Sequence, residues 1–131
     1  MFNKVGTVCI FVADQDRAKD FYVNTLGFEL RQDQPIYPGA ANRWLAVAPK
    51  GAQTDIILYL PDQNWQHYAQ VVGKSQAVTI DVSNVLELVK QLKAKGVKFQ
   101  GEPDVQPWGT NVFMLDSEGN TILLVELPKQ G

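Results

Sequence analysis

The sequence predicts an α+β fold in which two tandem βαβββ modules form a single domain over residues 1–131. Two observations predict it. An order of strand, helix, returning strand and hairpin occurs twice, in modules at 1–61 and 75–128 joined by a polar linker at 62–74. Corresponding stretches also match, since "LGFEL" resembles "KGVKF" and "WLAVAPKG" resembles "VFMLDSEG". One module alone cannot close its sheet, so we expect the two to pack together.

The first module begins with a strand at residues 5–13, which are rich in β-branched and aromatic side chains. A helix follows up to Gly27, a residue type that ends helices readily, and either Asp14 or Asp16 caps its start. The stretch "FELRQDQ" returns as a strand. "RWLAVAP" and "TDIILYLP" then form a hairpin around the turn residues of "PKGAQ".

The second module repeats this order. "QAVTIDV" predicts a strand, and a helix follows with Ser83 or Asn84 as its cap and Gly96 as its end. "VKFQ" is the returning strand, and "NVFMLD" and "TILLVEL" form the second hairpin.

Composition narrows the function classes. The formal net charge is -2, so no basic excess favours nucleic acid as a partner. No apolar run approaches the length of a membrane helix and no secretion signal is recognisable, so we expect a cytoplasmic protein without a membrane partner. The only cysteine, Cys9, excludes an internal disulfide and reads as a packing residue more readily than as a nucleophile.

Three stretches resemble the glyoxalase/bleomycin-resistance/dioxygenase superfamily, also called the vicinal oxygen chelate proteins. They lie at residues 12–30, 81–99 and 106–120, the last containing "LDSEGN" where the family has a "DPDGN" turn. The resemblance implies an open barrel of curved sheets with the helices outside, a ligand cavity in its concave interior, and a homodimer. It says less about function, because this fold hosts many chemistries.

The resemblance also implies four metal-ligand positions, usually filled by His and Glu. In this chain they fall on Thr7, Asp55, Ala77 and Leu123. Alanine and leucine cannot bind a divalent cation, a threonine hydroxyl is a weak ligand, and one aspartate gives little affinity. We therefore expect no metal and no other cofactor. A set of several histidines is impossible within one chain, because His67 is the only histidine.

Strand alternation predicts which side chains face the cavity. The expected ligand-binding set mixes apolar walls with a few polar groups, and loop aromatics and Arg43 extend it to the rim: Thr7, Cys9, Phe11, Arg43, Trp44, Asp55, Ile57, Tyr59, Ala77, Thr79, Trp108 and Leu123. Such a lining suits a small organic molecule, aromatic or cationic. Arg43 is expected to pair either with a ligand carboxylate or with an acid such as Asp55.

Three functions follow from these residues and the resemblance. The first is a metal-free protein that binds a small molecule for resistance or sequestration. The second is a glyoxalase-like lyase or isomerase acting on a small carbonyl compound, with Asp55, Asp81 or His67 as the acid or base. The third is a metal enzyme with an atypical ligand set, in which a partner chain supplies ligands. Asp81 also fits a surface or capping role, and Asp55 and His67 fit ordinary turn and loop roles.

Overall fold

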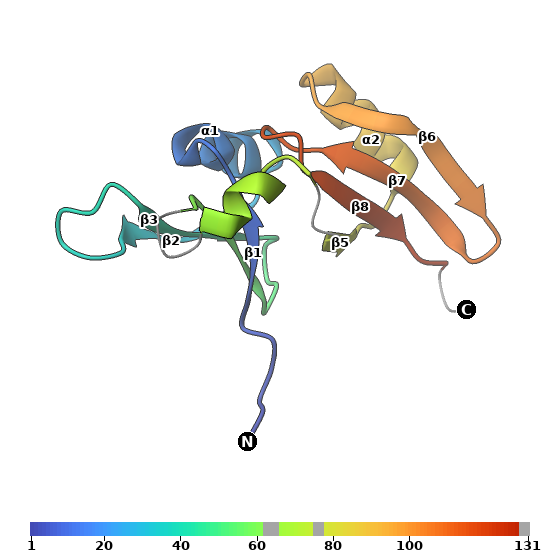
Figure 1. Ribbon diagram of the computed structural model, residues 1–131. Helices are drawn as coiled ribbons and strands as arrows, with labels where there is room; N and C mark the ends of the chain where they lie inside the picture. The colour runs from blue at the N-terminus through green and yellow to red at the C-terminus, as the bar shows by residue number, and fades with distance from the viewer. Residues whose placement is uncertain (62–65, 75–77, 129–131) are drawn as a thin grey trace. The chain divides into compact units, whose positions relative to one another are not determined.

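The first module is a four-stranded sheet that carries one helix. The computed structural model describes residues 1–61, 66–74 and 78–128, without the side chains of 66–68. The elements are β1 (Thr7–Phe11), α1 (Gln15–Lys19) continuing into the π-helical turn η1 (Asp20–Thr25), β2 (Glu29–Pro35), β3 (Arg43–Ala48) and β4 (Asp55–Tyr59). The strand order is β1-β4-β3-β2, and β1 runs parallel to β4 (Figure 1).

The second module repeats this topology. Its elements are β5 (Val78–Asp81), α2 (Val85–Ala94), β6 (Lys98–Gln106), β7 (Gly109–Leu115) and β8 (Thr121–Glu126). The strand order is β5-β8-β7-β6, with β5 parallel to β8. The predicted α+β fold with two βαβββ modules is therefore confirmed.

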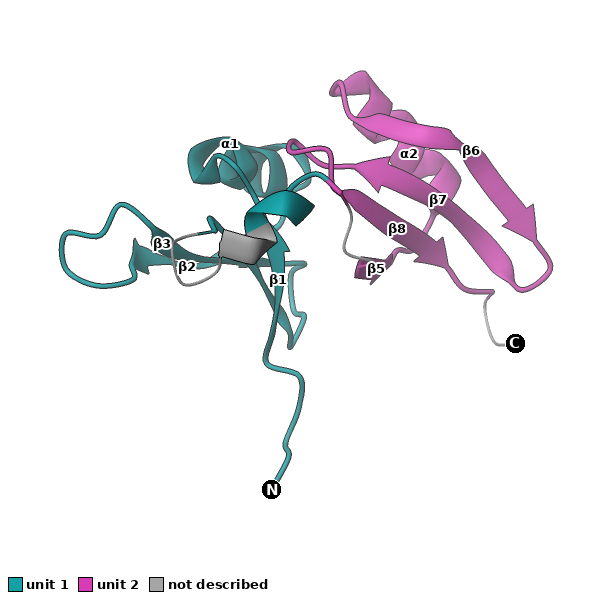
Figure 2. Cartoon of the chain, viewed as in Figure 1, with its two compact units in different colours: residues 1–73 teal, residues 74–131 magenta. Residues whose placement is uncertain are grey.

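The chain divides into two compact units, residues 1–73 and 74–131 (Figure 2). The segment predicted as an irregular linker contains a 3-10 helix, η2 (Gln66–Val71), which belongs to the first unit and contacts β1. A single 3-10 turn has no hydrophobic periodicity that the sequence would reveal. Among the described residues, no helix is long and apolar enough to cross a membrane.

Each sheet buries apolar side chains beneath its helix. In the first unit the fully buried set comes from β1, α1, β3 and β4 and includes Ile10, Ala18, Leu45, Val47 and Leu58. In the second unit it comes from α2, β7 and β8 and includes Val85, Met114 and Ile122. Burial of these apolar side chains stabilises the packing of each helix on its sheet.

The first helix differs from the single α-helix predicted for residues 14–27. After Lys19 it widens to π-helical geometry, shown by the bond from the Leu26 backbone N–H to the Phe21 carbonyl, 2.9 Å. The fully buried Tyr22 lies in this turn. Its ring centroid is 5.4 Å from that of Phe21 and 5.6 Å from that of Phe28. The wider turn accompanies this aromatic packing, which helical spacing alone does not reveal.

The returning strand of the second module is longer than predicted. β6 continues past Gln100 to Gln106, although Gly101 and Pro103 interrupt the strand pattern of the sequence. The pairing with β7 shifts between Gln100 and Asp104, and β6 lies at the edge of its sheet. An edge position with a bulge tolerates a proline, because no ladder hydrogen bond is lost there.

Candidate small-molecule site

The register of the first sheet places most of the predicted cavity residues on one face. β1 pairs with β4 so that Thr7 lies beside Asp55, Cys9 beside Ile57 and Phe11 beside Tyr59. Paired positions point their side chains to the same side of a sheet. The pairing of Ala46 with Ile57 adds alternate residues of β3, including Trp44, to this face. We call it the far face of the first sheet: Thr7, Cys9, Phe11, Trp44, Ala46, Asp55, Ile57 and Tyr59.

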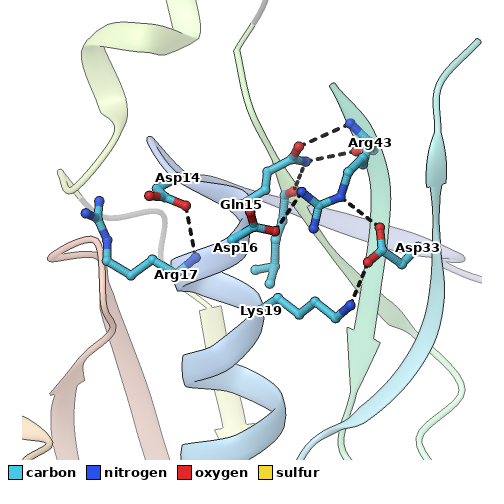
Figure 3. Close-up of polar contacts among 8 residues, drawn as sticks. Asp14, Gln15, Asp16, Arg17, Lys19, Asp33 and Arg43 are labelled. Carbon is cyan, nitrogen blue, oxygen red and sulfur yellow. Dashed lines mark hydrogen bonds and ion pairs between the residues drawn. The ribbon is translucent and has the colours of Figure 1, made fainter. Parts of the chain in front are cut away.

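The helix α1 covers the opposite face. Lys19 of α1 forms an ion pair with Asp33, 2.8 Å, and Asp16 forms one with Arg43, 2.9 Å. Asp33 pairs with Leu45 across β2 and β3, and Leu45 lies one residue from Ala46, so these contacts belong to the other side of the sheet. Figure 3 shows Lys19 and Asp16 reaching from the helix toward the strands.

Accessibility on the far face increases toward the start of β1 and β4. Ile57 is fully buried and Phe11 nearly so, with the Phe11 ring edge-on to Tyr59 at 6.2 Å. Cys9 is half-buried, and Thr7 is exposed. Burial raises the pKa of the Cys9 thiol, so Cys9 is neutral at neutral pH and contributes an apolar surface. The accessible part of this face therefore lies near Thr7 and Asp55.

An arginine that the sequence analysis did not select holds Asp55. The Arg31 Nη1 donates to Asp55 Oδ1 at 3.2 Å, and Nη2 donates to the backbone carbonyls of Ala52 at 2.9 Å and Pro49 at 3.4 Å. The Arg31 Nε lies 3.3 Å from Glu29 Oε1, an ion pair without hydrogen-bond geometry. Arg31 thus joins Asp55 to the turn between β3 and β4.

Arg43, by contrast, does not pair with Asp55, which was one of its two predicted roles. Its Nε donates to Asp33 Oδ1 at 2.9 Å, and Nη1 contacts Asp16 (Figure 3). Burial acts to raise the pKa of Asp33, but hydrogen bonds from Arg43 and Lys19 outweigh it, and the pKa is lowered. The hydrogen bond to Asp33 raises the pKa of Arg43. Arg43 therefore joins α1 to β2 and β3 on the helix side of the sheet.

A buried glutamine completes this attachment of the helix. Gln15 Nε2 donates to the backbone carbonyls of Arg43 and Leu58, both at 2.9 Å, and Gln15 Oε1 accepts from the Arg43 backbone N–H at 3.1 Å (Figure 3). Its side-chain amide thus bonds β3 and β4 together. Asp14 caps α1 by accepting from the Arg17 backbone N–H at 3.0 Å.

The second sheet has a corresponding far face. β5 pairs with β8 so that Thr79 lies beside Leu123 and Asp81 beside Val125, and β7 places Phe113 beside Leu123. Thr79 and Asp81 are exposed, Leu123 is half-buried, and Phe113 is 43% exposed. We define the far face of the second sheet as Thr79, Asp81, Phe113, Leu123 and Val125. Its phenyl ring is the accessible apolar group of this face.

Three other predicted residues are Trp108, Ala77 and His67. Trp108 is 55% exposed at the turn between β6 and β7. Ala77 and the side chain of His67 lie outside the described residues.

Two residues that belong to or contact these faces were not predicted from the sequence. Phe113 was missed because the prediction assigned faces only to strands that bear the family's metal positions, and alternation along "NVFML" would have identified it. No sequence pattern would have identified Arg31, because its contact with Asp55 depends on an irregular strand register.

Comparison with known proteins identifies the family. The model of the glyoxalase/bleomycin resistance protein/dioxygenase superfamily matches residues 4–124, and the chain belongs to this superfamily. The chain is 36% identical over 129 residues to the uncharacterized protein YetH of Bacillus subtilis, covering 96% of this chain and 100% of YetH.

Solved structures of the same family are also similar. TnmS3, an antibiotic binding protein from Streptomyces sp. CB03234, is 35% identical with a TM-score of 0.82, covering 97% of this chain and 98% of TnmS3. A superfamily member from Sphaerobacter thermophilus is 34% identical with a TM-score of 0.80, covering 95% and 98%.

The residues at the family's metal positions do not fit a divalent cation. Thr7 and Asp55 lie side by side, but the guanidinium of Arg31 contacts Asp55 and would repel a metal ion there. Leu123 is apolar, and Ala77 is outside the described residues. Among residues 1–61, 66–74 and 78–128, no three His, Cys, Asp or Glu side chains are grouped so that they would hold a metal.

Proposed function

We propose that this protein binds a small organic molecule without a metal ion, in a resistance or sequestration role. The observation that carries the proposal is the similarity to TnmS3, an antibiotic binding protein, at 35% identity over nearly the whole of both chains. The fold alone would not imply a ligand, so the proposal depends on the similarity in sequence as well as in fold.

The chemistry of the far faces supports the proposal. The first offers a half-buried Cys9 and Tyr59 beside the polar Thr7 and Asp55, and the second offers an accessible Phe113. Apolar walls with a few polar groups are typical of sites for organic ligands. The proposed ligand-binding residues are Thr7, Cys9, Trp44, Asp55, Tyr59, Thr79, Trp108, Phe113 and Leu123, with Phe11 and Ile57 as packing beneath them.

Titration of the native tryptophan fluorescence with a panel of antibiotics, bleomycin and planar aromatic compounds included, tests this function. We expect a saturable change for at least one compound, weakened by Phe113→Ala because the exposed ring is lost. Leu86→Ala is the matched control, since Leu86 is a similarly exposed apolar residue on α2, 57% exposed. No saturable change with any compound would contradict the proposal.

The same protein preparation tests the alternative of a glyoxalase-like lyase. Conversion of the hemithioacetal of methylglyoxal and glutathione is followed with metal-free protein and with protein incubated with nickel or zinc. Turnover that depends on Asp55, Asp81 or His67 would favour the lyase over the binding protein. We expect no turnover, because the Asp55 carboxylate forms an ion pair with Arg31 and Asp81 is exposed.

We further propose that the protein is a cytoplasmic homodimer. The proposal extends the expectation from the sequence, and the exposed apolar residues Val105 and Leu127 of the second unit support it. Light scattering during size-exclusion chromatography gives the mass in solution, and a monomer at all concentrations would contradict the dimer.

A further inference from the structure

We propose that Asp55 is a hydrogen-bond acceptor that selects ligands carrying a hydroxyl or other N–H or O–H donor, and that Arg31 positions it. This inference rests on the proposed function and names the ligand chemistry of the same site. It starts from the unequal use of the two carboxylate oxygens of Asp55.

Within the described part of the chain, a hydrogen-bond donor contacts one of these oxygens. Oδ1 accepts from Arg31 at 3.2 Å, whereas Oδ2 has no hydrogen-bond donor among the described residues. The Asp55 side chain is 29% exposed, so its free oxygen is open to a ligand while its surroundings are partly desolvated. A carboxylate in this position gains most from a donor, because charge-assisted hydrogen bonds are stronger than neutral ones.

A β-bulge gives Arg31 its reach. The pairing of β2 with β3 shifts between Leu30 and Gln32, which leaves Arg31 as the extra residue of the strand. Bulges re-aim side chains in this way. The guanidinium then donates hydrogen bonds to both the carbonyl of Ala52 and the carboxylate of Asp55. Ala52 lies in the turn before β4 and Asp55 begins β4, so Arg31 contacts the strand and its turn at once. These contacts hold Asp55 in one orientation.

The charge of this cluster indicates which ligand it prefers. Glu29 and Asp55 each contribute one negative charge and Arg31 contributes one positive charge, so the cluster has a net charge of -1. An anionic ligand is therefore disfavoured beside Oδ2, and a donor is favoured. Cys9, two residues after Thr7 on the same face, offers a neutral half-buried surface to the ligand's apolar part.

Three probes with one ring system test the inference: naphthol, its methyl ether, and the corresponding naphthoate. Calorimetry or NMR titration gives each affinity for wild type, Asp55→Ala, Asp55→Asn and Arg31→Met. We expect wild type to bind naphthol about tenfold more tightly than the ether, since a hydrogen bond to a charged group contributes at least that much. We expect naphthoate to bind most weakly.

The ratio of naphthol to ether affinity separates recognition from folding. Asp55→Ala should reduce the ratio to near one with the ether affinity retained, and Asp55→Asn, which keeps a neutral acceptor, should give an intermediate ratio. Arg31→Met should lower the ratio by releasing Asp55, whereas a purely structural role would weaken both probes equally. Glu102→Ala is the control, because Glu102 is an exposed carboxylate whose contact with Lys93 is 3.9 Å long.

Equal affinities of wild type for naphthol and ether, or a ratio that Asp55→Ala leaves unchanged, would overturn the inference. Failure of wild type to bind naphthol at millimolar concentration would overturn it as well. The antibiotic panel tests the proposed function separately. If an antibiotic binds saturably while these probes show no donor preference, the proposed function stands and only the inference about Asp55 is refuted.

Discussion

Replacement of Gln15 by alanine should destabilise the protein by about 3 kcal/mol, since the three hydrogen bonds of this buried residue contribute about 1 kcal/mol each. The side chain is 5% exposed, and its amide bonds the carbonyls of Arg43 and Leu58 and the N–H of Arg43. Alanine would leave these backbone groups of β3 and β4 without that partner. Water entering the space would reduce the loss, which sets a lower bound of about 2 kcal/mol.

Urea unfolding followed by circular dichroism measures this loss. Gln91→Ala is the matched control: Gln91 is an exposed helical glutamine that donates only to Glu87, at 3.2 Å, and should change stability by less than about 0.5 kcal/mol. Gln15→Glu adds a second test, because it faces two carbonyl oxygens with a carboxylate and should be more damaging at neutral than at acidic pH. A Gln15→Ala protein as stable as the Gln91→Ala protein would refute the reasoning.

Three further predictions concern the turn, the ion pairs and the metal positions. Gly109→Ala should lower the melting temperature, because φ is +150° and a Cβ would lie 2.7 Å from a backbone carbonyl of β8. Gly6→Ala is the control, because a Cβ at Gly6 would meet open space. Equal melting temperatures of the two variants would contradict the prediction. The pKa of Asp33 is lowered in the folded state, so its stabilising contribution is full above about pH 4 and declines as the pH falls through the folded-state pKa. The difference in stability between wild type and Asp33→Asn should therefore shrink as the pH falls. A difference that does not depend on pH would argue against the Arg43 and Lys19 contacts. Mass spectrometry after incubation with nickel, zinc, manganese or iron should find far less than one equivalent of metal, and a stoichiometric ion would show that other residues complete a site.

The helix ends show how far local sequence reasoning reaches. Two capping residues were possible for each helix, and the structure selects Asp14 and Asn84, each accepting from the backbone N–H three residues later. The helix stops at Gly27 and Gly96 have φ of 80° and 87°, the left-handed region that glycine adopts most cheaply. These features depend on neighbours within a few residues, so composition and spacing predict them well.

The roles of the arginines show where that reasoning ends. The sequence by itself determined the order of strands and helices in the two modules and the alternation of side chains along each strand, because hydrophobic periodicity is a local property of the chain. Only the tertiary structure decided that Arg43 bonds Asp33 on the helix side while Arg31 reaches Asp55. The reason is that a bulge of one residue and the pairing of strands distant in sequence set where a long side chain ends.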